Sequence, residues 1–209
     1  MKKLVKYTLV IAILGLLGYK SVYFKKLSEV KKAGNGKFDA VDFTKKLWDE
    51  KMPAKIDSAV ELSVLIKAIA ENKDAALNKY THAIDIGNYR YAIVKTQGTV
   101  ISLNEDEVQL ALTLPDSTTN AILATEYIYG NAIRDASGLV NVMDFPTGSD
   151  LNNISEELNG IIRKSVLPSF KQSVKKADKL DIVAAVELNR EHLKWTGMEL
   201  IPLRLHIVQ

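Results

Sequence analysis

Residues 89–103 read YRYAIVKTQGTVISL, and apolar and polar side chains alternate along much of this stretch. A period of two residues predicts a β-strand, and Gly98 within it predicts a bulge or a bend. The same alternation returns in EVQLALTL at 107–114 and in NAILATEYIYG at 120–130. The sequence therefore predicts three consecutive strands, of which the first begins at Tyr89.

A helix and two further strands are expected after these three. Apolar residues recur at helical spacing from about Asp150 onward: Leu151, Ile154, Leu158, Ile161 and Ile162. Pro168 predicts the end of this helix or a kink in it. Two more alternating stretches, LDIVAAVEL from Leu180 and MELIPLRLHIV from Met198, are the predicted last strands. Pro202 is expected at a sheet edge or at a bulge.

Three strands, a helix and two strands form the element order of an OB-type β-barrel. A simple α+β sandwich is the alternative. We assign residues 87–209 to an OB-like barrel subdomain with a helix between its third and fourth strands.

Residues 38–86 predict a small helical subdomain, so the fold class is α+β. Asp39 suits the N-cap of a first helix that runs to about Lys51 and ends before Pro53. A second helix is expected from the helical spacing of Leu62, Leu65, Ile66 and Ile69, and a short third one at 74–80.

The first 26 residues read MKKLVKYTLVIAILGLLGYKSVYFKK, a basic start followed by an apolar core at 7–19. This pattern predicts a signal peptide, and the absence of a clean small-x-small site favours an uncleaved signal anchor through residues 7–24. Residues 27–37 are the expected linker. The body would then lie outside the cytoplasm, in the periplasm or an equivalent space, although three lysines at 20, 25 and 26 oppose this orientation.

Charge is unevenly distributed along the chain. Residues 1–37 hold nine lysines and one glutamate, a net charge of +8, so the remainder sums to −5 of the overall +3. A mildly acidic body argues against nucleic acid as a partner. The sequence contains no cysteine, which excludes disulfides, thiolate metal sites and cysteine nucleophiles.

Catalytic and metal motifs are not apparent. His82, His192 and His206 are isolated from one another, and no serine lies in a G-x-S-x-G motif. We therefore predict no enzyme activity, no cofactor and no metal.

Tyrosines form one candidate site. Tyr89 and Tyr91, together with Arg90, lie on the first predicted strand, and Tyr127 and Tyr129 lie on the third. They are either a stacking platform or the filling of one barrel face. Beside an acidic body, a stacked ligand would be a sugar or a peptide rather than a nucleic acid.

Arg134 and Asp135 in GNAIRDA, residues 130–136, form the other candidate site. In an extended segment their side chains point to opposite faces, which predicts separate partners for the two groups. One interpretation is a structural clamp around a buried charge. The other is a guanidinium near the barrel mouth that holds an anionic or polyhydroxylated ligand.

The stretches FDAVDFTKKLWDEKMPAKIDSAVELSVLIKAI at 38–69 and YGNAIRDASGLVNVMDF at 129–145 resemble a bacterial family of predicted periplasmic lipoproteins, domain of unknown function 2291. The resemblance covers residues 38–208. It implies a helical subdomain joined to an OB-like barrel, and an accessory role beside sugar ABC transporters, whose genes often neighbour those of the family. It implies no catalytic residues. Leu16-Leu17-Gly18 resembles the start of a lipobox, but Tyr19 replaces the lipidated cysteine.

These observations favour a non-enzymatic, membrane-anchored ligand-binding or scaffold module of the cell envelope. One alternative is a glycan hydrolase that uses Asp135 and Asp144 as paired carboxylates, which requires both to face one cleft. A buried, ion-paired Asp135 would argue against it. The other alternative is a purely structural protein that acts through protein contacts.

Overall fold

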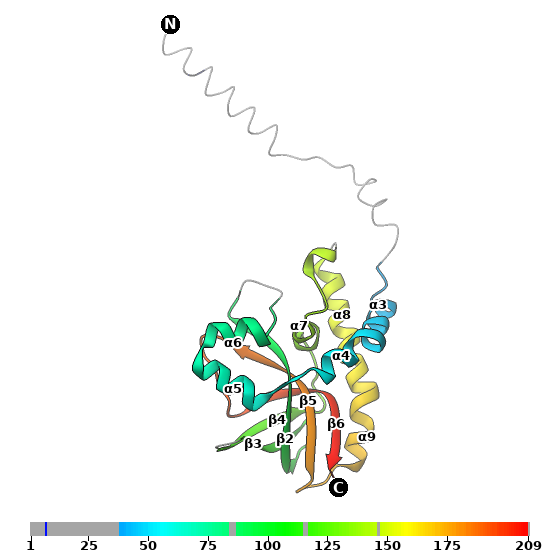
Figure 1. Cartoon of the computed structure of the whole chain (residues 1–209). Coiled ribbons are helices and arrows are strands. Elements are labelled where there is room, and N and C mark those ends of the chain that lie inside the picture. Colours follow the sequence, from blue (N-terminus) through cyan, green and yellow to red (C-terminus); the bar gives the residue numbers. More distant parts are fainter. Residues whose placement is uncertain (1–6, 8–37, 84–86, 115–116, 146, 209) are drawn as a thin grey trace. The chain divides into compact units, whose positions relative to one another are not determined.

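The computed structural model describes residues 7, 38–83, 87–114, 117–145 and 147–208 (Figure 1). By its contacts the chain divides into Met1–Phe38 and Asp39–Gln209, and the second unit contains all the described strands. The predicted signal anchor and linker lie outside the described residues, apart from Tyr7. No helix among the described residues has the length and apolar character needed to cross a membrane.

The second unit is built on a closed five-stranded barrel, as the element order predicts. Its strands are β2 (Tyr89–Leu103), β3 (Glu107–Leu114), β4 (Ser117–Ala124), β5 (Lys179–Asn189) and β6 (Met198–Val208). The sheet order is β1-β2-β3-β4-β6-β5, and β2 pairs with β5 as well, which closes the barrel. Neighbouring strands of the barrel are antiparallel except for β4 and β6, which pair in parallel over three residues. The sandwich alternative is therefore wrong.

Alternating side chains fill the barrel. Leu110, Leu112 and Leu123 are among the fully buried residues. Gly98 pairs with Leu112 on one side and with Leu180 on the other, and a β-carbon there would lie 2.9 Å from the Leu112 Cδ2 atom. The glycine thus permits a close approach of β2 to the Leu112 side chain of β3. The register shift in β2 comes slightly later, between Val100 and Ser102.

Pro202 lies at a bulge, one of the two predicted places. Val183 pairs with Arg204 and Ala184 pairs with Pro202, so one extra residue of β6 stands opposite β5. A bulge tolerates proline because the regular hydrogen-bond ladder is interrupted there.

The segment before the barrel is helical, but its first helix does not end before Pro53 as predicted. The Asp39 carboxylate caps α3 (Ala40–Lys46), which continues through a π-helical turn, η1 (Leu47–Lys51), into α4 (Met52–Asp57). Pro53 falls in the first turn of α4, directly after the π-helical turn, where the backbone hydrogen-bond pattern changes.

The remaining N-terminal elements agree with the predicted helices. They are α5 (Leu62–Glu71) and α6 (Lys73–Tyr80). A two-residue strand, β1 (Val60–Glu61), which the sequence does not suggest, pairs in parallel with β2.

The connection between β4 and β5 holds the rest of the helices. It contains α7 (Ala132–Ser137), the 3-10 turn η2 (Val142–Asp144), α8 (Gly148–Ile161), the π-helical turn η3 (Ile162–Val166) and α9 (Leu167–Ser173). The predicted apolar stripe of α8 is confirmed, with Ile154, Leu158 and Ile162 buried. Pro168 does not end the helical run, because it falls in the first turn of α9.

The third barrel strand is shorter than predicted. β4 ends at Ala124, because the backbone amides of Thr125 and Glu126 both donate to the Asp106 carbonyl, at 3.1 and 3.2 Å, and turn the chain out of the sheet. Tyr127 and Tyr129 therefore lie on a connecting segment and not on a strand.

Candidate functional site

Arg134 and Asp135 lie on α7, a short helix at one end of the barrel that contacts β2, β5 and α8 (Figure 1). All six residues of α7 are buried. The expectation of an extended segment with separate partners is wrong, because the Arg134 Nε atom donates to Asp135 Oδ1 at 2.6 Å. Arg134 is 7% and Asp135 3% exposed, so the pair is removed from solvent.

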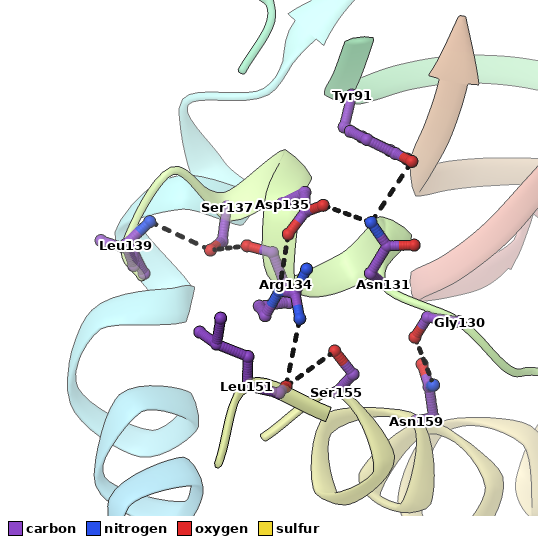
Figure 2. A network of polar contacts seen from close by, with 10 residues as sticks. All are labelled: Tyr91, Gly130, Asn131, Arg134, Asp135, Ser137, Leu139, Leu151, Ser155 and Asn159. Carbon is purple, nitrogen blue, oxygen red and sulfur yellow. Dashed lines mark hydrogen bonds and ion pairs between the residues drawn. The ribbon is translucent and has the colours of Figure 1, made fainter. Parts of the chain in front are cut away.

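Further hydrogen bonds tie this ion pair to the barrel and to α8 (Figure 2). The Asn131 side-chain amide donates to Asp135 Oδ2, and at 3.3 Å to the Tyr91 hydroxyl on β2. The Arg134 Nη1 atom donates to the Leu151 carbonyl of α8 at 3.1 Å. The network thus joins three elements that are distant in sequence, which is the behaviour expected of a clamp.

Tyr91 belongs to this network and not to an exposed platform. It is 7% exposed, and its backbone exchanges two hydrogen bonds with that of His82, at 2.7 and 2.8 Å. Burial raises the pKa of the Tyr91 phenol to about 12, so the hydroxyl is neutral at physiological pH. Tyr89 on the same strand is 51% exposed and is not part of the network.

The C-terminal end of α7 is fixed as well. The Ser137 hydroxyl donates to the Arg134 carbonyl at 2.6 Å and accepts from the Leu139 amide at 3.1 Å. Gly138 is left-handed, with φ of 61°, and a β-carbon there would lie 2.6 Å from the His82 ring. Burial lowers the pKa of His82, which favours a neutral ring against the glycine.

A hollow of about 400 Å³ opens between α7 and α8. Apart from Gly130, the residues that line it have polar side chains: Asn131, Arg134, Asn152, Ser155, Glu156 and Asn159. Asn159 donates to the Gly130 carbonyl at 2.9 Å, and the Ser155 hydroxyl donates to the Leu151 carbonyl at 3.2 Å. Two of the lining side chains are therefore held in place by the scaffold.

The Arg134 guanidinium is only partly satisfied. Its Nε and Nη1 atoms donate as described, whereas its Nη2 atom makes no hydrogen bond to any described residue. The Nη2 atom is not among the buried unpaired atoms, so it faces the open space of the hollow. Because Arg134 lines the hollow, this free nitrogen provides a donor for a bound molecule.

Two exposed tyrosines come shortly before Gly130, which lines the hollow. Tyr127 and Tyr129 are 62% and 61% exposed and stack with their ring centroids 6.4 Å apart. The Arg163 guanidinium lies 5.6 Å from the Tyr129 ring centroid and is ion-paired with Glu156 at 2.5 Å. Since Glu156 lines the hollow, the tyrosine pair and the hollow are connected through Arg163.

Sequence reasoning found Arg134 and the tyrosines but missed the polar face of α8. Asn152, Ser155, Glu156 and Asn159 follow the spacing i, i+3, i+4, i+7, which places them on one side of a helix. This polar stripe was the available signal, but on a surface helix it also describes an ordinary solvated face.

The paired-carboxylate hypothesis receives no support from the geometry. Asp135 is buried and ion-paired, and Asp144 is exposed on η2. Among the described residues, no group of three histidine, aspartate or glutamate side chains could hold a metal ion.

Two larger hollows lie elsewhere on the barrel. One of about 460 Å³ on β2, β5 and β6 is lined by charged groups that already have partners, such as Lys95 with Glu61 and Arg204 with Asp57. The other, of about 470 Å³, lies between α9 and β6. Neither is lined by a buried charged side chain with a free donor, so the α7–α8 hollow is the stronger candidate.

A family model described as "Predicted periplasmic lipoprotein (DUF2291)" matches residues 12–206. The chain belongs to this family. The crystal structure of an OB-fold protein from Thermotoga maritima MSB8 is also similar, with 24% sequence identity and a TM-score of 0.70 over 82% of this chain and 99% of that one. This similarity supports the barrel fold. No curated protein matches the chain.

The family description agrees with the predicted location in the cell envelope. This member of DUF2291 nevertheless has tyrosine at position 19 and no cysteine in its sequence, so it offers no thiol for lipid attachment.

Proposed function

We propose that this DUF2291 protein is a non-catalytic, membrane-anchored binding module of the cell envelope that holds a small neutral polar ligand in the α7–α8 hollow. The observation that supports it most is the free Nη2 atom of Arg134, on a guanidinium that is otherwise buried and fixed. A fixed donor in a polar hollow is an orienting group for a ligand.

Charge balance supports a neutral ligand. Arg134 is neutralised by Asp135, and Glu156 is neutralised by Arg163. The remaining lining side chains are amides and a hydroxyl, which are uncharged and offer mainly acceptor oxygens, with free amide hydrogens on Asn152 and Asn159. Such a set suits hydroxyl-rich or amide-bearing molecules, and it leaves an ionic ligand without a counter-charge.

An accessory role beside a sugar ABC transporter is compatible with this ligand class. The resemblance of the sequence implies that role, and the apolar leader would hold the module at the membrane that contains such a transporter. The binding module would then present or sense solute outside the cytoplasm.

The test is a thermal-shift screen of the full chain in a detergent that carries no sugar. The panel contains monosaccharides, polyols, short glycans, neutral amino acids, dipeptides and divalent cations. A ligand that binds only the folded state raises the melting temperature. We expect a reproducible rise with neutral hydroxyl-rich compounds and none with cations.

The helix α8 offers a matched pair of variants. Asn152 and Asn153 are adjacent and exposed, but only Asn152 lines the hollow. Asn152→Ala should reduce the shift and Asn153→Ala should preserve it. If no compound shifts the melting temperature, the proposal fails and a scaffold role through protein contacts takes its place.

A further inference from the structure

We propose that the ligand is a neutral oligosaccharide, with one sugar ring in the α7–α8 hollow and the next ring stacked on Tyr127 and Tyr129. This inference rests on the proposed function, because it names the ligand class of the same site and extends that site onto the tyrosine pair.

The hollow has the chemistry of a sugar subsite. Each sugar hydroxyl donates one hydrogen bond and accepts others. The Asn152 amide presents both kinds of group, and Asn159 retains one amide hydrogen and its carbonyl oxygen. Asn131 presents its carbonyl oxygen, because both of its amide hydrogens are bonded to Asp135 and Tyr91. The free Arg134 Nη2 atom adds a fixed donor that is already charge-balanced by Asp135. A phosphate or a carboxylate would meet no uncompensated positive charge here.

The tyrosine pair supplies an exposed aromatic surface, which the hollow lacks. Both rings are more than three-fifths exposed although they stack on each other, with an interplanar angle of 28°. Aromatic rings pack against the C–H face of a flat, amphipathic ligand while their hydroxyls remain in water. Two neighbouring exposed rings are therefore a surface for the apolar face of a sugar.

The α7–α8 hollow and the tyrosine pair are connected, which indicates a ligand long enough to contact both. Gly130 lines the hollow and directly follows Tyr129, and Arg163 bridges Glu156 to the Tyr129 ring. The ring centroids of Tyr127 and Tyr129 are 6.4 Å apart. A succession of polar hollow, guanidinium and two rings favours a ligand of more than one sugar unit.

Isothermal titration of the full chain, in the same sugar-free detergent, tests this inference. The probes are maltotriose, cellotriose, chitotriose and xylotriose, each compared with its own monosaccharide, and adenosine as a ring-bearing ligand that is not a glycan. At least one trisaccharide should bind about tenfold more tightly than its monosaccharide, a difference of about 1.4 kcal/mol.

Variants test whether the tyrosines cause the difference in affinity between a trisaccharide and its monosaccharide. Tyr127→Ala should remove about tenfold from trisaccharide affinity and leave monosaccharide affinity unchanged, whereas Tyr127→Phe, which retains the ring, should bind as the unmodified chain does. Tyr80→Ala is the matched control, since Tyr80 is a partly exposed tyrosine on α6 whose only described ring contact is with Lys79.

The outcomes separate the two proposals. Equal affinities for trisaccharides and monosaccharides, or no effect of Tyr127→Ala, would overturn the oligosaccharide inference while binding in the hollow stands. Tyrosine-dependent binding of adenosine alone would also overturn it. If Asn152→Ala changes no affinity at all, the hollow is not the site and the proposed function itself fails.

Discussion

Arg134 and Asp135 form the most deeply buried of the described ion pairs. Removing one partner leaves the other charge buried and uncompensated, which typically costs about 3–5 kcal/mol. We expect Arg134→Ala to lower the free energy of unfolding by about that amount, measured by guanidinium chloride denaturation with circular dichroism. Arg204→Ala is the control, because its pair with Asp57 is exposed and should contribute less than about 1 kcal/mol. Equal losses for the two variants would contradict the clamp.

Gly138 is needed both for its backbone angle and for space. Gly138→Ala places a side chain at φ of 61° against the His82 ring, so we expect a loss of more than about 1 kcal/mol of stability. Gly148→Ala has open space around its β-carbon position and no positive φ, and it should be neutral or slightly stabilising. Melting temperatures of the two variants make the comparison, and a stable Gly138→Ala would exclude the predicted clash.

Tyr91 gives the protein an alkaline pH dependence. Its pKa is raised from 10.0 to about 12, so its contribution is fully present below pH 10 and is lost as the pH rises through about 12. In that window the unfolded chain has released a proton that the folded chain retains. We expect stability to fall by about 1–3 kcal/mol more between these limits than in Tyr91→Phe. If the unmodified protein and Tyr91→Phe lose the same stability between the two pH values, the Tyr91 hydroxyl is not the cause of the pH dependence.

At the level of elements, the strands are the most predictable part of the fold. β2, β3 and β6 have the predicted bounds, since alternation over eight or more residues leaves little ambiguity. For β4 the predicted strand is too long, because the alternation continues to Tyr129 while two hydrogen bonds to the Asp106 carbonyl end the strand. Such a contact, between residues about twenty positions apart, leaves no mark on a local pattern.

Helices are harder to predict where tertiary contacts decide them. α7 is only six residues long, and its sequence pattern fits a helix no better than a strand. Its conformation therefore depends on the buried ion pair and on Gly138. The hollow is beyond prediction for the same reason, since it exists only where α7 meets α8. Pro53 and Pro168 are possible helix ends by sequence, yet each lies in the first turn of the following helix.

The Asp39 cap of α3 is a feature that the sequence predicts, and it can be tested alone. Its carboxylate accepts from the Asp42 amide at 3.0 Å. Asp39→Ala should cost about 1 kcal/mol, and Asp39→Asn much less, because asparagine also caps well. Chemical denaturation of both variants would measure this, and equal losses would mean that the charge matters more than the cap.

Across the folded unit, the barrel is a scaffold for a single long connection. All the residues that line the α7–α8 hollow, together with Tyr127 and Tyr129, lie between β4 and β5. Tyr91 on β2 reaches into this connection and fixes it through Asn131. The candidate site is therefore built by one connection between two barrel strands and is fixed to the barrel through Tyr91.

Ligand binding in the hollow between α7 and α8 should protect both of these helices and leave most of the barrel unaffected. Hydrogen exchange with mass spectrometry measures this on the full chain, with and without a saturating amount of the panel compound that gives the largest thermal shift. We predict slower exchange of the backbone amides in residues 127–138 and 148–161 and little change in the barrel strands. Protection centred on β2, β5 and β6, or no protection at all, would contradict binding in the hollow.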